Sequence, residues 1–489
     1  MPSHNYVMPR PTFHFTPQRN WINDPNGLVH HGGLWHLFYQ YNPEGPDWGN
    51  MSWGHATSTD LQHWSEHPVA LPYSDGEQIY SGSIVATQGE PQLTAFYTSA
   101  FSNGRQAQSK ATSIDGGFTW EQDPHNPVLD RGTNAFRDPK VIRYADADGT
   151  DRWVLLAVEA EDRQVLFYSS TDLSNWEYRS SFGPLGPEQD AGQLVWECPD
   201  LIPLPVDGDP ENLRWVLLIS TNAVGEDPDP EGSSMSYLIG DFDGTSFTTE
   251  STGLTRLDHG RDFYAGVTFD NAPANEKIML GWMSNWAYAG DIPSAPWRGA
   301  MSLPRRLSLR TIDGFPRLLQ RPPEFILEQI AAVPAGRFEL AQAAEVVLSG
   351  HSLLELHWDP AATGRLSLKL QGDSDASVDI EHSPDTGALR ITRHGAAVEA
   401  IHAAFPSTST IAMDAAPVQL LLSLDGPLLE LFINDGEATA SNLIVLGAGA
   451  VTARLDSDLP GCVTVTTFDV PASDNLSALS SARSATTLV

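Results

Sequence analysis

Cysteine is nearly absent from this 489-residue chain, which holds only Cys198 and Cys462, far apart in the sequence. Two thiols cannot form a disulfide framework, and they cannot supply a zinc site built from several cysteines. The sequence also lacks any apolar run near the roughly 20 residues that a membrane-spanning helix needs. With 41% apolar and 18% charged residues, we expect a globular protein rather than a disordered one.

Basic residues are scarce beside acidic ones. Lys and Arg number 28 and Asp and Glu 62, which gives a formal net charge of −34. Such an acidic surface repels phosphate backbones and anionic lipids, so neither nucleic acid nor membrane is expected as a partner. The first 18 residues hold four prolines and no apolar stretch of the kind found in secretory signals. We expect a cytoplasmic protein, or a secreted one if the chain is a mature form.

Aromatic residues and glycines are abundant, with 14 Trp and 40 Gly. Up to about residue 320, short β-type runs recur between turn signals, at residues 34–39, 93–98, 153–158, 214–220 and 277–282. A second pattern recurs with them: an Asp opens a turn that an aromatic residue closes, at residues 60–64, 115–120, 172–176 and 243–247. We expect each Asp to cap its turn and each aromatic ring to pack between neighbouring sheets.

One such motif per roughly 50–70 residues is typical of a propeller blade with four strands. Four copies, together with residues 264–306, which lack a copy, predict five blades. Beyond residue 321 a short helix is expected at 324–330, and alternating β-type segments follow. The expected fold is therefore all-β, with a five-bladed β-propeller at residues 1–320, a linker with the short helix at 321–340, a β-sandwich at 341–470 and a flexible tail at 471–489.

Three short acidic motifs stand at or just before β-type runs of different predicted blades. They are Trp-Ile-Asn-Asp-Pro-Asn-Gly at 21–27, Phe-Arg-Asp-Pro-Lys at 136–140 and Trp-Glu-Cys-Pro-Asp at 196–200. In each, a proline within two residues of the carboxylate restricts the backbone and so orients the side chain. Because the innermost strands of a propeller surround one axis, Asp24, Asp138 and Glu197 can converge in one funnel.

Crowded carboxylates raise one another's pKa, so that one can remain a proton donor while another is ionised. That division of labour is what glycoside hydrolysis requires. The alternative interpretation is that the Asp-Pro pairs only cap turns.

The three motifs resemble those of glycoside hydrolase family 32, the invertases, inulinases and levanases. Residues 53–64 and the Tyr-Ser-Gly-Ser segment at 80–83 resemble further blocks of that family, and residues 429–446 resemble its sandwich domain. Residues 281–286 and 296–305 are most similar to the exo-acting inulinase and levanase branch. The resemblance extends from about residue 11 to residue 470 and implies an enzyme that needs no metal or cofactor.

The resemblance implies a retaining β-fructosidase that releases terminal fructose from inulin- or levan-type fructans and from sucrose. Asp24 would be the nucleophile at the anomeric C2, and Glu197 would act as acid and then as base. Asp138 would hold ring hydroxyls and stabilise the transition state. A retaining pair of carboxyl groups lies only ~5–5.5 Å apart. Cys198 is expected to be a small buried residue beside the acid, not a nucleophile.

The same resemblance assigns the substrate-binding residues. Those expected around the terminal fructose are Asn23, Gln40, Trp48, Ser83, Arg137 and Trp286, and those expected at the leaving-group sugar are Asp258 and Asp262. We prefer Trp286 to Trp282 because it lies nearer the end of its strand. Packing between blades is the alternative role for these tryptophans and for Trp48, and an ion pair with Asp138 is the alternative for Arg137.

Several other functions stay open at this stage. A fructosyltransferase would use the same residues, whereas a sugar-binding propeller without activity would have lost a carboxylate. An arabinan-cleaving five-bladed enzyme would separate its carboxylates more widely. A sucrose-6-phosphate hydrolase is disfavoured, since the acidic chain has no Lys/Arg cluster. Specificity beyond the first sugar depends on residues 188–195 and 287–296, and the sandwich is expected to buttress the propeller, with homodimer formation or sugar binding as further roles.

Overall fold

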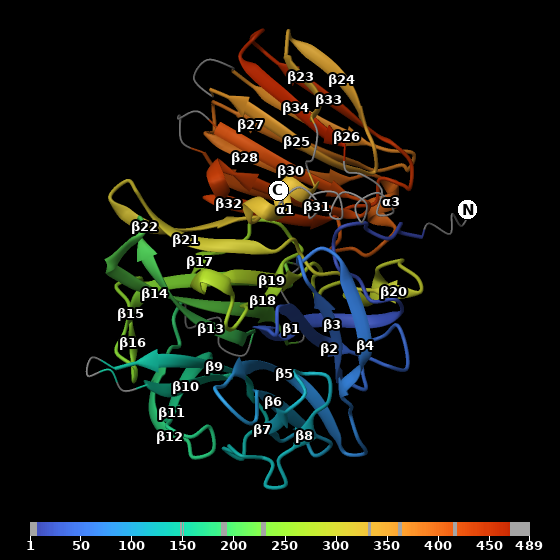
Figure 1. The fold of residues 1–489 in the computed structure, drawn as a ribbon. Helices are drawn as coiled ribbons and strands as arrows, with labels where there is room; N and C mark the ends of the chain where they lie inside the picture. Colours follow the sequence, from blue (N-terminus) through green and yellow to red (C-terminus); the bar gives the residue numbers. More distant parts are fainter. Residues whose placement is uncertain are drawn as a thin grey trace, which may run out of the picture.

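Short strands separated by turns form the blades of a β-propeller in the lower part of Figure 1. The structure is a computed structural model that describes residues 7–146, 149, 151–186, 193–225, 231–330, 334–359, 364–413 and 418–469. Blade I consists of β1 (Asn20–His31), β2 (Leu34–Tyr41), β3 (Ser52–Ser58) and β4 (Trp64–Leu71). Blade II consists of β5 (Glu77–Ala86), β6 (Leu93–Phe101), β7 (Gln106–Ser113) and β8 (Glu121–Gln122). Blade III consists of β9 (Phe136–Ala145), β10 (Asp151–Glu159), β11 (Gln164–Ser170) and β12 (Glu177–Phe182).

The last two blades are joined by one parallel bridge, between Val206 and Leu309. Blade IV consists of β13 (Leu194–Val206), β14 (Asp209–Ala223), β15 (Ser233–Phe242) and β16 (Phe247–Thr248), with β17 (Thr255–Arg256) paired to β15. Blade V consists of β18 (Tyr264–Thr268), β19 (Ile278–Trp282), β21 (Arg305–Ile312) and β22 (Phe315–Arg321). The short elements η2 (Pro273–Asn275), η3 (Ala289–Asp291) and β20 (Trp297–Arg298) lie within blade V, and β20 pairs with β1 of blade I. The prediction of five blades is confirmed.

The Asp-led motifs connect the third and fourth strands of blades I to IV. In blade III, Oδ1 of Asp172 accepts hydrogen bonds from the backbone N–H groups of Ser174 (2.9 Å) and Asn175 (2.8 Å). Trp176, which closes this turn, packs against the preceding blade, with its ring 5.4 Å from that of Phe96 in β6. Equivalent aspartate-capped turns occur at Asp60, Asp115 and Asp243. The role predicted for the aspartate is thus confirmed in all four turns. The role predicted for the aromatic residue is confirmed in blades II to IV, where Trp120, Trp176 and Phe247 pack against a ring of the preceding blade.

The C-terminal part is a sandwich of two six-stranded sheets, in the upper part of Figure 1. One sheet has the order β23 (Pro334–Glu339), β34 (Val463–Asp469), β25 (His351–Trp358), β30 (Val418–Asp425), β31 (Leu428–Ile433) and β32 (Ala438–Leu443). The other has the order β24 (Ala343–Leu348), β33 (Val451–Ser457), β26 (Leu366–Gln371), β27 (Ser377–Ser383), β28 (Ala388–His394) and β29 (Ser407–Ala412). Alternate residues of these strands, such as Leu366, Leu368 and Leu370 in β26, are buried in a common core.

Helix α1 (Glu324–Ile330) lies at the predicted position, and the short elements α3 (Ala396–Glu399) and η4 (Asn434–Gly436) interrupt the sandwich. Strand β23 falls within the segment predicted as a linker, so the sandwich already begins there. The predicted tail at 471–489 lies outside the described residues. Among the described helices, none combines the length and the apolar composition needed to cross a membrane.

The two domains are joined by backbone pairing as well as by side chains. The N–H of His259 donates to the carbonyl oxygen of Thr439 in β32 at 2.8 Å, and the N–H of Asp262 donates to that of Ser441 at 3.0 Å. Gly260 lies between them, and a Cβ added there would stand 2.0 Å from the oxygen of Ser441. The segment just before β18 therefore runs against the sandwich as closely as a neighbouring strand.

Candidate active site

The five innermost strands β1, β5, β9, β13 and β18 surround the propeller axis, and each contacts the next. Each strand also has an irregularity in its pairing, at residues 22–25, 80–82, 137–140, 197–200 and 264–267. A β-bulge leaves a residue out of the ladder and turns its side chain, and bulges are frequent next to active sites. Asp24, Ser81 and Asp138 are among the residues left out of the ladder in this way. Glu197 and Tyr264 are the last paired residues before the irregularities of their strands.

Proline and left-handed backbone shape three of these bulges. Pro25, Pro139 and Pro199 stand where the ladder is interrupted, and a proline fits there because it has no N–H to donate. Asp138 has φ 62° and Cys198 has φ 47°, values that cost non-glycine residues energy and are often found at functional sites. The Asp-Pro and Glu-Cys-Pro patterns thus belong to bulges of inner strands and not merely to capped turns.

Two residues bring the three acids into one site. The Nη2 of Arg137 donates to Oε1 of Glu197 at 3.0 Å, and its Nε lies 3.9 Å from Oδ2 of Asp138. The Sγ of Cys198 lies 3.4 Å from Oδ2 of Asp24 and 3.8 Å from Oδ2 of Asp138. Asp24, Asp138 and Glu197, from three different blades, therefore surround one small space, as the funnel hypothesis requires.

Asp24 is buried, with 8% of its surface exposed, and is surrounded by donors. The Oγ of Ser81 donates to Oδ2 at 2.6 Å, and the Nδ2 of Asn23 donates to Oδ1 at 3.0 Å. Burial raises the pKa of Asp24, and these hydrogen bonds oppose the rise while the charge of Glu197 adds to it. The net result is a raised pKa, so Asp24 becomes fully ionised only at a higher pH than an exposed aspartate.

Asp138 is also buried, and its Oδ2 accepts a hydrogen bond of 2.9 Å from the backbone N–H of Cys198. Burial raises the pKa of Asp138 to about 7; Arg137 opposes this, and the charge of Glu197 increases it. Burial alone would lower the pKa of Arg137, but Glu197 and Asp138 reverse this and raise it, so the guanidinium stays charged. The shorter ion pair of Arg137 is with Glu197, whereas the sequence had suggested Asp138.

Glu197 is held at both carboxylate oxygens. Arg137 contacts Oε1, and the hydroxyl of Tyr264 makes a short hydrogen bond to Oε2. Burial and the neighbouring charge of Glu197 raise the pKa of Tyr264 well above its usual value, so the phenol remains a donor. Because 19% of the Glu197 side chain is exposed, this carboxyl group can reach a substrate.

Ser81 and Tyr264 were missed by the sequence analysis. Ser81 belongs to the Tyr-Ser-Gly-Ser segment from which Ser83 was chosen, and Tyr264 ends the segment from which Asp258 and Asp262 were chosen. The motifs therefore identified the right segments but not the residues that face the acids.

Three of the other predicted residues lie beside the acids or at the rim of the site. Asn23 bonds to Asp24, as described, and receives a hydrogen bond of 2.8 Å from the indole of Trp21. Trp286 is half-buried, with its ring 6.0 Å from that of Trp21, whereas Trp282 is fully buried and available only for packing. Trp48 is 47% exposed and lies edge-on to Tyr80 of β5.

Gln40, also predicted to bind fructose, is buried, and its side-chain amide donates to the carbonyl oxygen of Ile79 at 3.0 Å. Of the first predicted specificity loop, 188–195, residues 188–192 lie outside the described residues. The second loop, 287–296, includes η3.

Ser83, predicted to bind fructose, has a structural role between two blades. Its hydroxyl donates to the carbonyl oxygen of Pro139 and accepts from the N–H of Val141, both at 2.9 Å. It therefore joins blades II and III and has no proton left to donate to a sugar.

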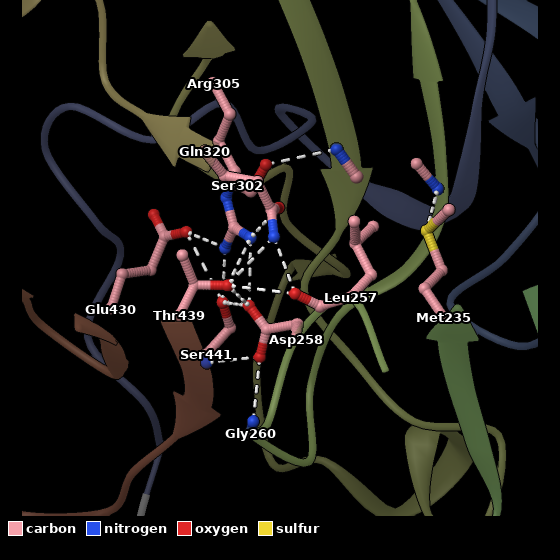
Figure 2. A network of polar contacts seen from close by, with 12 residues as sticks. Met235, Leu257, Asp258, Gly260, Ser302, Arg305, Gln320, Glu430, Thr439 and Ser441 are labelled. Atoms are coloured by element: carbon pink, nitrogen blue, oxygen red, sulfur yellow. Dashed lines mark hydrogen bonds and ion pairs between the residues drawn. The ribbon is translucent and has the colours of Figure 1, made fainter. Parts of the chain in front are cut away.

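The prediction for Asp258 and Asp262 is wrong, because both carboxylates lie at the boundary between propeller and sandwich and are at most 2% exposed. Figure 2 shows Asp258 among its partners, with Nη1 of Arg305 at 2.9 Å from Oδ2. Asp262 pairs with Arg393 of β28 at 2.7 Å. Oxygens that are paired and buried in this way cannot meet a leaving-group sugar.

Among the described residues, no group of three or more His, Cys, Asp or Glu side chains is arranged to hold a metal ion. The chemistry that the site can perform with its own groups is acid, base and nucleophilic catalysis by paired carboxylates.

Comparison with known proteins places this geometry in a family. The N-terminal domain of the glycosyl hydrolases family 32 matches residues 14–322, and the C-terminal domain of that family matches residues 331–457. A levanase of Bacillus subtilis is 38% identical over 89% of this chain and 66% of its own length. An extracellular exo-inulinase of Aspergillus niger is 40% identical over 65% of this chain, and this chain again spans only 66% of that relative.

A solved structure supports the same assignment. The crystal structure of an exo-inulinase from Aspergillus awamori superimposes with a TM-score of 0.86 at 31% identity, covering 95% of this chain and 98% of that one. With both domain matches, the shared architecture and the acids in one site, the chain belongs to the glycosyl hydrolases family 32.

Proposed function

We propose that this protein is a retaining β-fructofuranosidase that releases terminal fructose from inulin- or levan-type fructans and from sucrose. The observation that carries the proposal is that the three acids lie around common neighbours. Arg137 contacts both Asp138 and Glu197, and Cys198 contacts both Asp24 and Asp138. The relatives named levanase and exo-inulinase support the choice of substrate.

In the first step, the carboxylate of Asp24 attacks C2 of the terminal fructosyl unit while the bond from C2 to the glycosidic oxygen breaks. Glu197 gives its proton to that oxygen, and the leaving sugar departs. The product on the enzyme is an ester between Asp24 and fructose. The hydrogen bonds from Ser81 and Asn23 keep Asp24 ionised and oriented for attack.

In the second step, Glu197 takes a proton from water, and the oxygen of that water attacks C2. The ester bond breaks, fructose leaves with its anomeric configuration retained, and Asp24 regains its charge. Arg137 and Tyr264 hold the two oxygens of Glu197, so the same carboxyl group faces the reacting oxygen in both steps. Asp138 is fixed by the N–H of Cys198, and in its ionised form it supplies negative charge beside the developing oxocarbenium ion.

The removal of one sugar at a time agrees with the closure of the space around the propeller axis at one end. Two residues beyond Asp138, Lys140 forms a buried ion pair of 3.0 Å with Asp200 of β13 and donates to the carbonyl oxygen of Thr268 in β18 at 2.8 Å. Three inner strands are thus tied together beyond the acids, and substrate has to enter from the opposite end, past Trp48 and Trp286. This favours exo action on a chain end.

The test is to incubate the protein with sucrose, inulin and levan and to identify the sugars released over time. We expect free fructose from the start, with no intermediate oligosaccharides from the polymers. Asp24→Asn and Glu197→Gln should lower kcat about 10³-fold or more without lowering Tm by more than a few degrees. If oligosaccharides dominate the products at high sucrose, the enzyme is a fructosyltransferase and the proposed hydrolysis is refuted. Activity restricted to sucrose-6-phosphate would refute the substrate assignment.

A further inference from the structure

Two segments of the propeller carry a group of the active site and, two residues away, a group anchored to the sandwich. In the first, Tyr264 bonds to Glu197, and Asp262 precedes it. In the second, Trp286 stacks on Trp21, and Tyr288 follows it. The hydroxyl of Tyr288 donates to Oδ1 of Asp262 at 2.6 Å, so the two anchors also contact each other.

One side chain of the sandwich binds both anchors. Arg393 of β28 donates from Nη1 to Oδ2 of Asp262 at 2.7 Å and from Nη2 to the hydroxyl of Tyr288 at 2.6 Å. Its Nη1 also donates to the carbonyl oxygen of Leu443, and its guanidinium lies 3.9 Å above the ring of Phe405. The planar group is therefore fixed in position and orientation before it meets the propeller.

Burial makes this contact specific. Arg393 is 2% exposed, Asp262 is fully buried and Tyr288 is 1% exposed, so water cannot replace a lost partner. Asp262 has a third donor within the protein, since its Oδ2 also accepts from the N–H of Leu443 at 2.8 Å. A buried carboxylate and its arginine hold their geometry strictly, because any displacement leaves a charge unpaired.

A displacement of Asp262 or Tyr288 would be transmitted to the active site through two residues of backbone. Asp262 and Tyr264 are separated by one residue at the start of β18, and Tyr264 is paired with Trp282 just before the irregularity of that strand. Tyr288 and Trp286 are separated by one residue, and Asn285 ties this segment to the other through a hydrogen bond of 2.8 Å to the carbonyl oxygen of Arg261.

We propose that Arg393 is a positioning residue through which the sandwich sets the geometry of the active site, fixing Tyr264 against Glu197 and Trp286 against the sugar. The sandwich is then part of the catalytic unit and not only a support for the propeller. This inference rests on the proposed function, because it assigns Glu197 and Trp286 to fructoside cleavage.

The second interdomain network offers a matched control. Arg305 is as deeply buried as Arg393 and pairs with Asp258 at 2.9 Å and with Glu430 at 2.7 Å (Figure 2). The hydroxyl of Ser441 bridges Arg305 and Asp258, as that of Tyr288 bridges Arg393 and Asp262. In this network, however, Asp258 lies six residues from the tyrosine that holds Glu197. The guanidinium of Arg305 lies 3.9 Å above the ring of Phe263, next to that tyrosine, so the control variants have to leave this guanidinium in place.

The experiment compares Arg393→Lys and Tyr288→Phe with the controls Thr439→Ala and Ser441→Ala in the full chain. Each control removes a hydroxyl that contacts Arg305 and Asp258 and leaves the guanidinium on Phe263. For each variant we would measure Tm, kcat and KM for sucrose, and the pH dependence of kcat/KM. We expect Arg393→Lys to lower kcat/KM about tenfold and Tyr288→Phe to lower it less, since small displacements of positioning groups are costly. Both should move the alkaline limb of the profile to higher pH, because a looser donor favours the protonated acid.

The controls should lower Tm by a similar amount and keep kcat/KM within about twofold of the wild type. The inference is overturned if the first pair behaves like the wild type, or if both pairs lose activity equally. Amide hydrogen exchange of residues 263–268 and 284–289 tests the positioning independently of activity. Faster exchange is expected in Arg393→Lys and Tyr288→Phe but not in the controls. A wild-type protein that releases no fructose would refute the proposed function, and the exchange data would still test the positioning.

Discussion

The hydroxyl of Ser81 donates to Oδ2 of the proposed nucleophile Asp24 at 2.6 Å, and both groups are buried. The hydrogen bond stabilises the ionised carboxylate and opposes the rise in pKa that burial causes. Ser81→Ala removes it without adding volume. The pKa of Asp24 should therefore rise further, and activity should be lost at a higher pH as the solution is acidified.

The size of this effect can be estimated from the contact. A hydrogen bond to a charged group contributes about 1.5–3 kcal/mol, and about 1.4 kcal/mol corresponds to one pH unit. The acid limb of kcat/KM in Ser81→Ala should thus lie about 1–2 pH units above that of the wild type. Well above both limbs, where Asp24 is ionised in either protein, the two rates should approach each other.

The assay is initial-rate fructose release from sucrose in buffers of constant ionic strength across the acid range. Ser83→Ala is the matched control, since it deletes the same hydroxyl two residues along β5, where the donor bonds to the carbonyl oxygen of Pro139. The control should lower Tm and leave the acid limb in place. The assigned role of Ser81 would be refuted if the acid limb of kcat/KM lay at the same pH in Ser81→Ala and the wild type. It would also be refuted if Ser83→Ala moved the acid limb as far as Ser81→Ala does.

Two further predictions concern Tyr264 and His14. Tyr264→Phe removes the donor at Oε2 of Glu197, so kcat should fall about tenfold and the alkaline limb should move to higher pH; an unchanged profile would contradict the contact. Burial would lower the pKa of His14, but Asp425 and Glu430 raise it to about 9. The resulting stabilisation is complete below pH ~6.5 and is lost as the pH rises through about 9. Tm should fall over that interval in the wild type, and an equal fall in His14→Gln would contradict the assignment.

The blade pattern could be predicted from the sequence because its interactions are local. An aspartate such as Asp172 bonds to N–H groups two and three residues away, and the aromatic residue that closes the turn lies four residues away. The three acids could be predicted for a related reason. A proline beside Asp24 or Asp138 constrains the backbone of that residue itself, so the motif and the bulge are the same few residues.

The choice between Ser81 and Ser83 could not be predicted from the motif. In a regular strand, residues two apart face the same side, so both serines would be equivalent. The bulge between Tyr80 and Gly82 breaks that equivalence and directs only Ser81 to Asp24. Whether a strand is bulged depends on its pairing with β6, which lies outside the motif.

The sequence by itself thus predicted the five blades, the alternating strands of the sandwich and the three acidic motifs, since each leaves a pattern within a few residues. Only the tertiary structure decided that Asp258 and Asp262 bind arginines at the domain boundary, because Arg393 lies 131 residues beyond Asp262 in the chain. Buried charges have to find partners, and which partner is near is a property of how two domains pack. The groups that orient the acids depend on that packing, whereas the acids themselves are encoded locally.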